Sequence, residues 1–429
     1  MPLLLRLSAP GVLLVAFQSA VSIGDSYFVG RLGTTPLAGL ALVFPLVMLL
    51  QMTSSGAMGG GVSSAVARAL GSGDARMARR LTVHALVIAL AMGALFTLVL
   101  LPFGRSAYSF LGGRDESLAQ ALAYSDILFG GAIAVWLANT LANLLRGTGD
   151  MLTPALALVG AAVVQVPLCG ALVLGLEPAP RLGIVGAATA YVAAFSVAGG
   201  AMAIAVFRPA SALRPRAGDF RLEWRLFREI LRVGVISMAN AAQTVLTALV
   251  LTGLVGRYGA AALAGYGVGL RLELLQIPLV FAVGQTMVVL VGMHVGARRP
   301  QRAKRIAWAG AALGAAVTLA IGATVAIAPQ LWVGLFSADA AVLEAGARYL
   351  RTVGPFYPFL AAGVALYFAA QGAGRVLWPL LAGTARLAIV VAGGLLAASL
   401  QGIFAVIALA MLAFGVLTML FTARILKWD

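Results

Sequence analysis

The chain contains one stretch twice, as VGRLGTTPLAG at Val29–Gly39 and as VGRYGAAALAG at Val255–Gly265. The two copies are identical at seven of eleven positions and lie 226 residues apart. Further matches follow at an offset of 225, and they include Leu49–Gln51 with Leu274–Gln276, Tyr124 with Tyr349, and Gly147–Gly149 with Gly372–Gly374. Matches that stay in register along most of a chain indicate a duplicated unit.

Both copies lie among long apolar runs. Of the 429 residues 62% are hydrophobic and 10% are charged, and the mean hydropathy is +1.01, too apolar for a soluble domain of this length. Runs such as Leu81–Leu101 and Ile306–Trp332 contain no Asp, Glu, Lys or Arg, and they reach the roughly 20 residues that cross a bilayer. Because lipid offers backbone groups no partners, these runs must be helical.

We therefore predict an all-α membrane protein with about twelve transmembrane helices. The fourth and tenth are expected at 118–145 and 343–371, each as a single span. The duplication predicts two parallel lobes of about six helices each around a central cleft. We expect an N-terminal lobe at 1–212, a cytoplasmic linker at 213–227 and a C-terminal lobe at 228–429.

The basic residues indicate the orientation of the chain. The net charge of +16 is concentrated in alternate loops, after the second and eighth predicted spans and around the connection between the sixth and seventh. This distribution predicts a multi-pass protein of the cell (inner) membrane with both termini in the cytoplasm, anchored to membrane lipids and not binding nucleic acid. The single Cys169 excludes an intramolecular disulfide, and His84 and His294 form no metal motif. No cofactor or metal is expected.

Asp25 is the most informative charged residue because it lies inside the first predicted span. A charge in hydrocarbon costs roughly 2.5–3.5 kcal/mol or more, so it requires a reason. Gln18, Ser22 and Asp25 recur at helical spacing and are expected to share a stripe that faces a cavity. A carboxylate there is suited to taking up and releasing a proton. The alternative is an Asp near the outer interface, bonded to a neighbouring backbone group.

Other polar residues in the predicted spans have two interpretations each. Glu273, in the eighth span, is a second-lobe candidate with Arg386 as its possible partner, and the alternative is a purely structural ion pair. Asn139 and Asn143 share one helix face, where they either line a cavity near Asp25 or, as we favour, hold neighbouring helices. Soft or polar residues form the expected substrate cavity, although ordinary lipid contact or core packing is the alternative for each: Gln18, Ser22, Met48, Met238, Gln243 and Phe281.

The sequence around the repeat resembles the multidrug and toxic compound extrusion (MATE) family. The resemblance rests on motifs in the family's order and spacing: GDSYFVGRLGTTPLAG (Gly24–Gly39), GSGDARMARR (Gly71–Arg80), NLLRGTGDMLTP (Asn143–Pro154), LGIVGAATA (Leu182–Ala190), RVGVISM (Arg232–Met238) and QGAGRVLWP (Gln371–Pro379). It implies two six-helix lobes that extrude organic compounds in exchange for H⁺ or Na⁺. Thr189, within the fourth motif, joins Asp25, Asn139 and Asn143 as a cation-coupling candidate.

The resemblance also implies roles and departures. Asp25 matches the family's first-helix Asp, which is implicated there in cation coupling. Where many members carry Asn and then Asp or Asn in the fifth span, this chain has Gln165 and Cys169. A thiol is a poor ligand for Na⁺, which prefers oxygen, so we expect proton coupling with Gln165 in the site.

Taken together, these residues predict a secondary active efflux transporter that works by alternating access, without enzymatic activity. It is expected to be a monomer that exports amphipathic, cationic organic compounds in exchange for H⁺, with Na⁺ the less favoured ion. The alternative is a lipid or lipid-linked glycan flippase of the same superfamily. An intramembrane enzyme is disfavoured because no span carries HExxH, GxSxG or paired catalytic acids.

Overall fold

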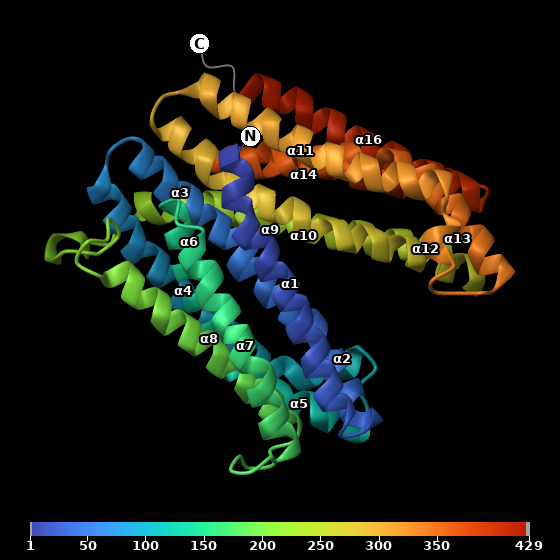
Figure 1. Cartoon of the computed structure of the whole chain (residues 1–429), viewed down its shortest axis with the longest axis horizontal. Coiled ribbons are helices and arrows are strands. Elements are labelled where there is room, and N and C mark those ends of the chain that lie inside the picture. The colour runs from blue at the N-terminus through green and yellow to red at the C-terminus, as the bar shows by residue number, and fades with distance from the viewer. Residues whose placement is uncertain (1, 426–429) are drawn as a thin grey trace. The chain divides into compact units, whose positions relative to one another are not determined.

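The computed structural model describes the backbone of residues 2–425. Within that range the side chains of residues 2–6, 12–13, 15–16, 18–19, 277–279 and 425 lie outside the described part. The described residues form helices joined by turns and short loops and contain no β-strand, which confirms the all-α prediction (Figure 1).

Helices run almost without interruption through both halves of the chain. The first half contains α1 (Pro2–Gly30), α2 (Thr34–Gln51), the π-helical segment η1 (Met52–Met58), α3 (Gly59–Gly71), α4 (Ala75–Phe110), α5 (Asp115–Gly130), α6 (Ala132–Gly147), α7 (Leu152–Leu174), α8 (Ile184–Phe207) and the 3₁₀ turn η2 (Ala217–Asp219). The second half contains α9 (Trp224–Gly256), α10 (Ala260–Gly296), α11 (Pro300–Ile327), α12 (Gln330–Val333), α13 (Ala340–Val353), the 3₁₀ turn η3 (Gly354–Phe356), α14 (Tyr357–Gly372), α15 (Leu377–Leu396) and α16 (Leu400–Ile425).

These helices correspond in order to the predicted spans. In the described part, ten helical runs are long and apolar enough to cross a membrane, and the bent pair α5 and α6 makes an eleventh. The 29-residue α1 corresponds to the remaining predicted span. The fourth span is a broken helix, because the chain bends by 50° between α5 and α6 at Gly131, whose missing Cβ makes room for Val192. The tenth is interrupted by η3, which contains Pro355.

The repeated stretch performs the same two structural tasks in each half. Gly33 and Gly259 precede α2 and α10 with φ angles of 123° and 96°, which residues with a Cβ rarely adopt. Gly39 packs α2 against α5, where a Cβ would come within 2.8 Å of Gln120 Cβ. Gly265 packs α10 against α13 in the same way, where a Cβ would come within 2.8 Å of Ala345 Cβ. The copies are therefore alike because each begins a span and then packs it closely.

The described chain forms two compact units. One is Ala9–Gly234, and the other joins the residues up to Ser8 with those from Val235 onward. In the first unit α6, α7 and α8 pack side by side, and in the second α11, α14 and α16 do (Figure 1). The N-terminal part of α9 packs with the first unit because Gly61 lies against the backbone of Ile230 and Gly234. The limits expected from the sequence for lobes and linker stay a prediction.

The polar connection between α8 and α9 is fastened to α4. Asp219, 3% exposed, accepts hydrogen bonds from Arg79 Nε and from the Arg216 N–H, each at 2.9 Å. The fully buried His84 donates from Nδ1 to the Arg80 carbonyl at 2.7 Å and accepts at Nε2 from the Glu223 N–H at 2.9 Å. The histidine thus has a structural partner on each ring nitrogen.

These bonds affect the ionisation of Asp219. Burial acts to raise the pKa of its carboxyl group, but the hydrogen bonds from Arg216 and Arg79 and the charges of Arg79 and Arg76 outweigh burial and hold the pKa below its usual value. The ionised carboxylate therefore stabilises the folded connection.

The glycine packing predicts selective effects of alanine. Gly39→Ala and Gly265→Ala should each destabilise the protein by about 1–3 kcal/mol, because the added methyl group has no space. Gly30→Ala and Gly256→Ala are matched controls, since a Cβ there meets nothing within 4 Å. Thermal unfolding of the purified protein in detergent measures the effect. Equal shifts for all four variants would contradict the packing explanation.

The fastened connection predicts a pH-dependent contribution from Asp219. At neutral pH, Asp219→Asn should lower stability by about 1–3 kcal/mol, because hydrogen bonds to a charged acceptor are weakened. The pKa is lower in the folded chain, so the contribution is complete above the unfolded value of about 4 and is lost as the pH falls further. Thermal unfolding at several pH values, with exposed Glu344→Gln as control, tests this. An unchanged difference at low pH would disprove it.

Candidate functional site

The site in the first unit is built around Asp25. The carboxylate Oδ2 accepts a hydrogen bond from Gln165 Nε2 at 3.0 Å. The other oxygen, Oδ1, is buried and has no hydrogen-bond partner among the described residues. Gln165 is 3% exposed on α7. The sequence-predicted pair of Asp25 and Gln165 is therefore in direct contact, with one carboxylate oxygen still available.

Close packing of α1 against α7 positions this pair. Gly170 lies under the Phe28 ring, and a Cβ there would come within 2.8 Å of it. Gly24 approaches Val166, and a Cβ there would come within 3.1 Å of its side chain. Because both glycines are next to the site along their helices, the backbones come close enough for Gln165 to reach Asp25.

Three further side chains lie near Asp25. Cys169 is fully buried one turn after Gln165, and Tyr124 is 4% exposed on α5. Together with Tyr191 of α8, they are near enough for the charge of Asp25 to act on them. The described surroundings of the carboxylate thus contain an amide, a thiol and two phenols.

A chain of hydrogen bonds continues from Tyr191 across the first unit. Gln51 Nε2 donates to the Tyr191 hydroxyl at 2.5 Å, and Asn139 Nδ2 donates to Gln51 Oε1 at 3.0 Å. Asn139 also donates to Ser54 Oγ at 2.8 Å, and Asn143 donates to the Ser55 carbonyl at 3.2 Å. Both serines belong to η1, and π-helical segments of this kind occur frequently at functional sites.

The remaining first-unit candidates are not joined to Asp25 by hydrogen bonds. Asn139 and Asn143 bond to α2, η1 and α6 instead, as expected for residues that hold helices together. Thr189 donates to the Val185 carbonyl of its own helix at 2.8 Å. The contacts of Asn139 and Asn143 agree with the favoured role of holding helices together, while the assignment of all three residues to cation coupling stays a prediction.

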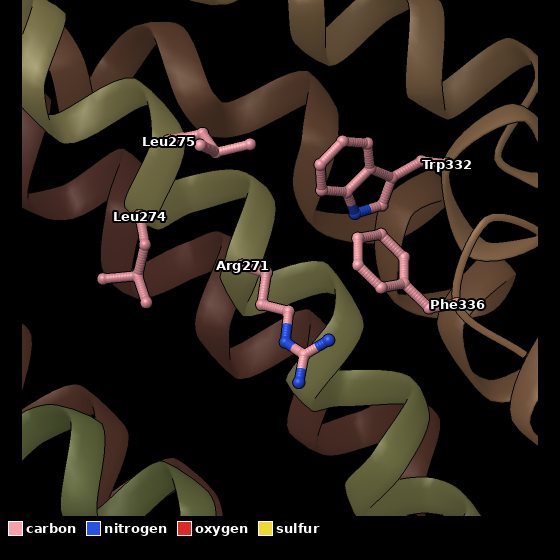
Figure 2. Close-up of a pocket in the computed structure, with 5 residues that line it drawn as sticks. All are labelled: Arg271, Leu274, Leu275, Trp332 and Phe336. Carbon is pink, nitrogen blue, oxygen red and sulfur yellow. The ribbon is translucent and has the colours of Figure 1, made fainter. Parts of the chain in front are cut away.

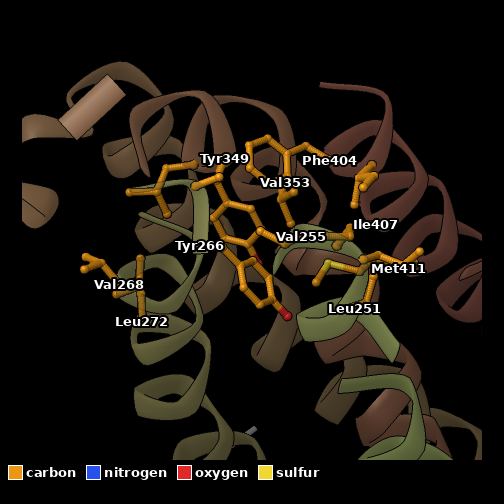
Figure 3. Packing of buried hydrophobic residues seen from close by; sticks show 14 of the residues in the cluster. Leu251, Val255, Tyr266, Val268, Leu272, Tyr349, Val353, Phe404, Ile407 and Met411 are labelled. Carbon is orange, nitrogen blue, oxygen red and sulfur yellow. The ribbon is translucent and has the colours of Figure 1, made fainter. Parts of the chain in front are cut away.

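The second unit contains its own acid inside a predicted span, the half-buried Glu273. Glu273 of α10 accepts a hydrogen bond from the Tyr349 hydroxyl of α13. The Tyr349 ring makes edge-on contacts with Tyr266 and Phe404, both at 5.3 Å between centroids. Figure 3 shows these rings surrounded by aliphatic side chains such as Leu251. A buried cluster of aromatic and aliphatic side chains thus positions the Tyr349 hydroxyl that donates a hydrogen bond to Glu273.

Arg386 does not form the ion pair that was expected with Glu273. The ion pairs of the described residues, which require an N–O distance of at most 4.0 Å, do not include Arg386 with Glu273. The two charges are nevertheless close enough to interact. The guanidinium instead lies 5.8 Å from the centre of the Phe414 ring, and its Nε is buried without a hydrogen-bond partner. Glu273 accepts its hydrogen bond from Tyr349, and Arg386 does not form an ion pair with it.

The candidates for the substrate cavity belong to different units. Ser22 and Met48 are exposed in the first unit, and the Gln18 side chain lies outside the described residues. In the second unit Met238 is half-buried, and Phe281, 38% exposed, packs edge-on against Phe368. Gln243 donates to Thr384 Oγ1 at 2.6 Å, while its Oε1 is buried without a hydrogen-bond partner. Their assignment to a substrate cavity stays a prediction.

A pocket of about 340 Å³ lies in the second unit (Figure 2). It is lined by Arg271, Leu274, Leu275, Trp332 and Phe336. The Arg271 guanidinium lies 5.2 Å from the centre of the Phe336 ring, and Trp332 Nε1 donates to the Val268 carbonyl at 2.9 Å. The pocket combines one cation with a fixed aromatic wall.

Four residues of these sites were missed by reasoning from single positions. They are Gln51, Tyr124, Tyr191 and Tyr349. The repeat contained the signal for three of them, because Gln51 matches Gln276 and Tyr124 matches Tyr349. Polar residues that recur in a duplicated membrane protein are candidates for the same task in both halves. Tyr191 has no such signal, since its role appears only when the fold brings it within hydrogen-bond distance of Gln51.

Two related helical units, each with a partly buried carboxylate that accepts a hydrogen bond from a polar side chain, define a two-lobe membrane transporter. The family model described as MatE matches residues 10–170 and 236–396, and the chain belongs to this family, whose members are transporters and not enzymes. The two matches begin 226 residues apart, which is the offset of the repeated stretch and confirms the duplication.

The chain is similar to curated transporters over most of its length. The FAD transporter of Shewanella oneidensis is 27% identical over 369 residues, covering 85% of this chain and 80% of that protein. The probable multidrug resistance protein NorM of Thermotoga maritima is 24% identical over 384 residues, covering 88% and 81%. A solved structure described as MATE in the bent conformation has the same fold, with a TM-score of 0.91, 23% identity, and coverage of 99% and 95%.

The contact between Glu273 and Tyr349 predicts strong coupling between these residues. Tyr349→Phe should destabilise the protein by about 1–3 kcal/mol, because a half-buried acid loses its donor. Glu273→Gln in the same background should then cost less than it does alone. Thermal unfolding of the single and double variants measures this, with Tyr258→Phe as control because its hydroxyl has only a 3.4 Å contact. Additive effects would show that the two side chains act independently.

Proposed function

We propose that this protein is a proton-coupled efflux transporter in which Asp25 takes up and releases the coupling proton. The observation that carries the proposal is the Asp25 carboxylate, with Oδ2 bonded to Gln165 and Oδ1 buried without a partner. A buried carboxylate oxygen without a donor is the natural place for a proton. Neutralising the acid also removes the cost of a charge in hydrocarbon.

The residues beside Asp25 support protons over sodium ions. A sodium site needs several oxygen ligands, and this carboxylate has the Gln165 amide and the Cys169 thiol as neighbours on α7. Gln165 already directs its Nε2, a donor, at the carboxylate. A donating amide, a thiol and two phenols fit a proton-binding carboxylate better than a cage around Na⁺.

The transport cycle follows from this chemistry. In the outward-open state a proton neutralises Asp25, weakens its bond with Gln165 and loosens the packing of α1 against α7. Substrate then leaves to the outside, the protein turns inward, and the proton is released to the cytoplasm. One charge moved through 100 mV supplies about 2.3 kcal/mol, which would drive export of a neutral compound. Exchange of one proton for one monovalent cation moves no net charge, so the pH gradient would drive export of a cationic substrate.

The substrates we propose are amphipathic, cationic organic compounds, which suit an acid inside the membrane. Multidrug resistance relatives such as NorM support export of small organic molecules. We further propose that one chain in the cell (inner) membrane, with both termini in the cytoplasm, forms the working transporter. Both related halves are already present in a single polypeptide.

A second substrate class is favoured by the pocket in Figure 2. Arg271 offers a cation beside the Trp332 and Phe336 rings. An anionic aromatic compound would place its negative group on the guanidinium and its ring against the aromatic wall. The similarity to a FAD transporter supports this class.

One experiment tests coupling and substrate class together. Proteoliposomes with native protein, Asp25→Asn or Asp126→Asn receive either a pH gradient or a Na⁺ gradient, and transport of a fluorescent cationic dye and of a flavin dinucleotide is measured. Asp126, an exposed acid on α5, is the matched control. We expect dye transport driven by the pH gradient, reduced to background in Asp25→Asn and retained in Asp126→Asn.

Other outcomes would change specific parts of the proposal. Transport driven only by Na⁺ would overturn proton coupling, and full activity of Asp25→Asn would remove Asp25 from the mechanism. Movement of the flavin alone would replace the cationic substrates with the anionic class. Movement of neither compound, with transfer of a labelled lipid between leaflets, would favour the flippase alternative.

A further inference from the structure

A basic hollow lies where α8 ends and the connection to α9 begins. It has a volume of about 520 Å³, and its lining includes Arg79, Pro209, Ser211, Arg214, Pro215 and Arg216. Three guanidinium groups therefore come from two parts of the chain, one from α4 and two from the connection. Among the described residues, no acidic side chain lines the hollow.

The frame of the hollow is held in place before any ligand arrives. Asp219 accepts hydrogen bonds from Arg79 Nε and from the Arg216 N–H, each at 2.9 Å. Leu213, which belongs to the connection, is fully buried. The Leu213 N–H also bonds to Ser211 Oγ at 3.2 Å. The side chains of Arg214 and Arg216 are exposed, and neither forms an ion pair among the described residues. Their charges are thus available to an anion.

An apolar stripe on α8 leads to the hollow. Val197, Ile204 and Phe207 are 66%, 76% and 41% exposed, and their spacing places them along one side of the helix. Phe207 is the last residue of α8, and Pro209 of the hollow follows two residues later. A cationic site at the end of an exposed apolar stripe matches a molecule with an anionic head and a hydrocarbon tail.

We propose that this hollow binds the phosphate group of an anionic membrane phospholipid, whose acyl chain lies along the α8 stripe. Arginine forks bind phosphate oxygens in pairs and are favoured for this recognition. Free phosphate would bind the same guanidinium groups, but it has no apolar part that could contact the α8 stripe. The site would fasten the connection between the two halves to the lipid surface.

Lipid binding to the purified full-length protein tests the proposal. Native mass spectrometry resolves individual bound lipids during titration with phosphatidylglycerol, phosphatidylcholine or inorganic phosphate. The test variant is Arg214→Gln with Arg216→Gln, which leaves the Arg79–Asp219 pair intact. Its matched control is Arg299→Gln with Arg302→Gln, which removes the same charge from exposed positions at the start of α11. Ile204→Gln alters the stripe without changing charge.

We expect one phosphatidylglycerol molecule to bind more tightly than phosphatidylcholine. The Arg214 and Arg216 double variant should weaken it roughly thirtyfold, as expected for two interfacial arginines, and Ile204→Gln should weaken it as well. The control pair should keep native affinity. Because the readout is binding, it is independent of whether Asp25 couples transport to protons.

Three results would overturn the proposal. Equal losses in the test and control pairs would show diffuse attraction to a basic surface in place of a site. Equal affinity for phosphatidylglycerol and phosphatidylcholine would exclude recognition of the anionic lipid. Competition by inorganic phosphate at similar concentrations, with Ile204→Gln unchanged, would assign the hollow to soluble phosphate instead.

Discussion

Hydrocarbon supplies no hydrogen bonds, and this constraint governs the whole molecule. It makes the apolar runs helical, because only a helix satisfies its own backbone within one segment. It also requires each polar side chain inside a span to find a partner in the protein. Asp25 accordingly accepts a hydrogen bond from Gln165, and Glu273 accepts one from Tyr349. Asn139 donates hydrogen bonds to Gln51 and Ser54. Asp25 Oδ1 is an exception, since it is buried without a hydrogen-bond partner among the described residues.

Small residues make these partnerships possible. Gly39 and Gly265 bring α2 and α10 close to their neighbours in equivalent places, and Gly24 and Gly170 do so around Asp25. Without a Cβ the helix backbones approach closely, and short polar side chains can then span the gap. Glycine positions in this chain thus set the distances on which the polar contacts depend.

The two units share an ancestor but hold their acids differently. In the first unit an amide from α7 bonds the acid of α1, and in the second a tyrosine from α13 bonds the acid of α10. Tyr124 and Tyr349 are equivalent in the repeat, and each lies near the acid of its own unit. The tyrosine thus recurs at equivalent positions, whereas the two acids lie on helices that do not correspond in the repeat.

The sequence by itself determined the helical class, the order of the spans and the duplication. These depend on properties that are local or periodic, namely apolar length and the glycines of the repeated stretch. It also identified Asp25, because a charge in a span is conspicuous without any structure, whereas Gln165 was identified through the resemblance to the MATE family. Only the tertiary structure decided that Tyr349 and not Arg386 satisfies Glu273, that Thr189 bonds its own helix, and that Tyr191 joins the polar chain. Such choices depend on which helix faces come together, and packing between segments distant in sequence sets them.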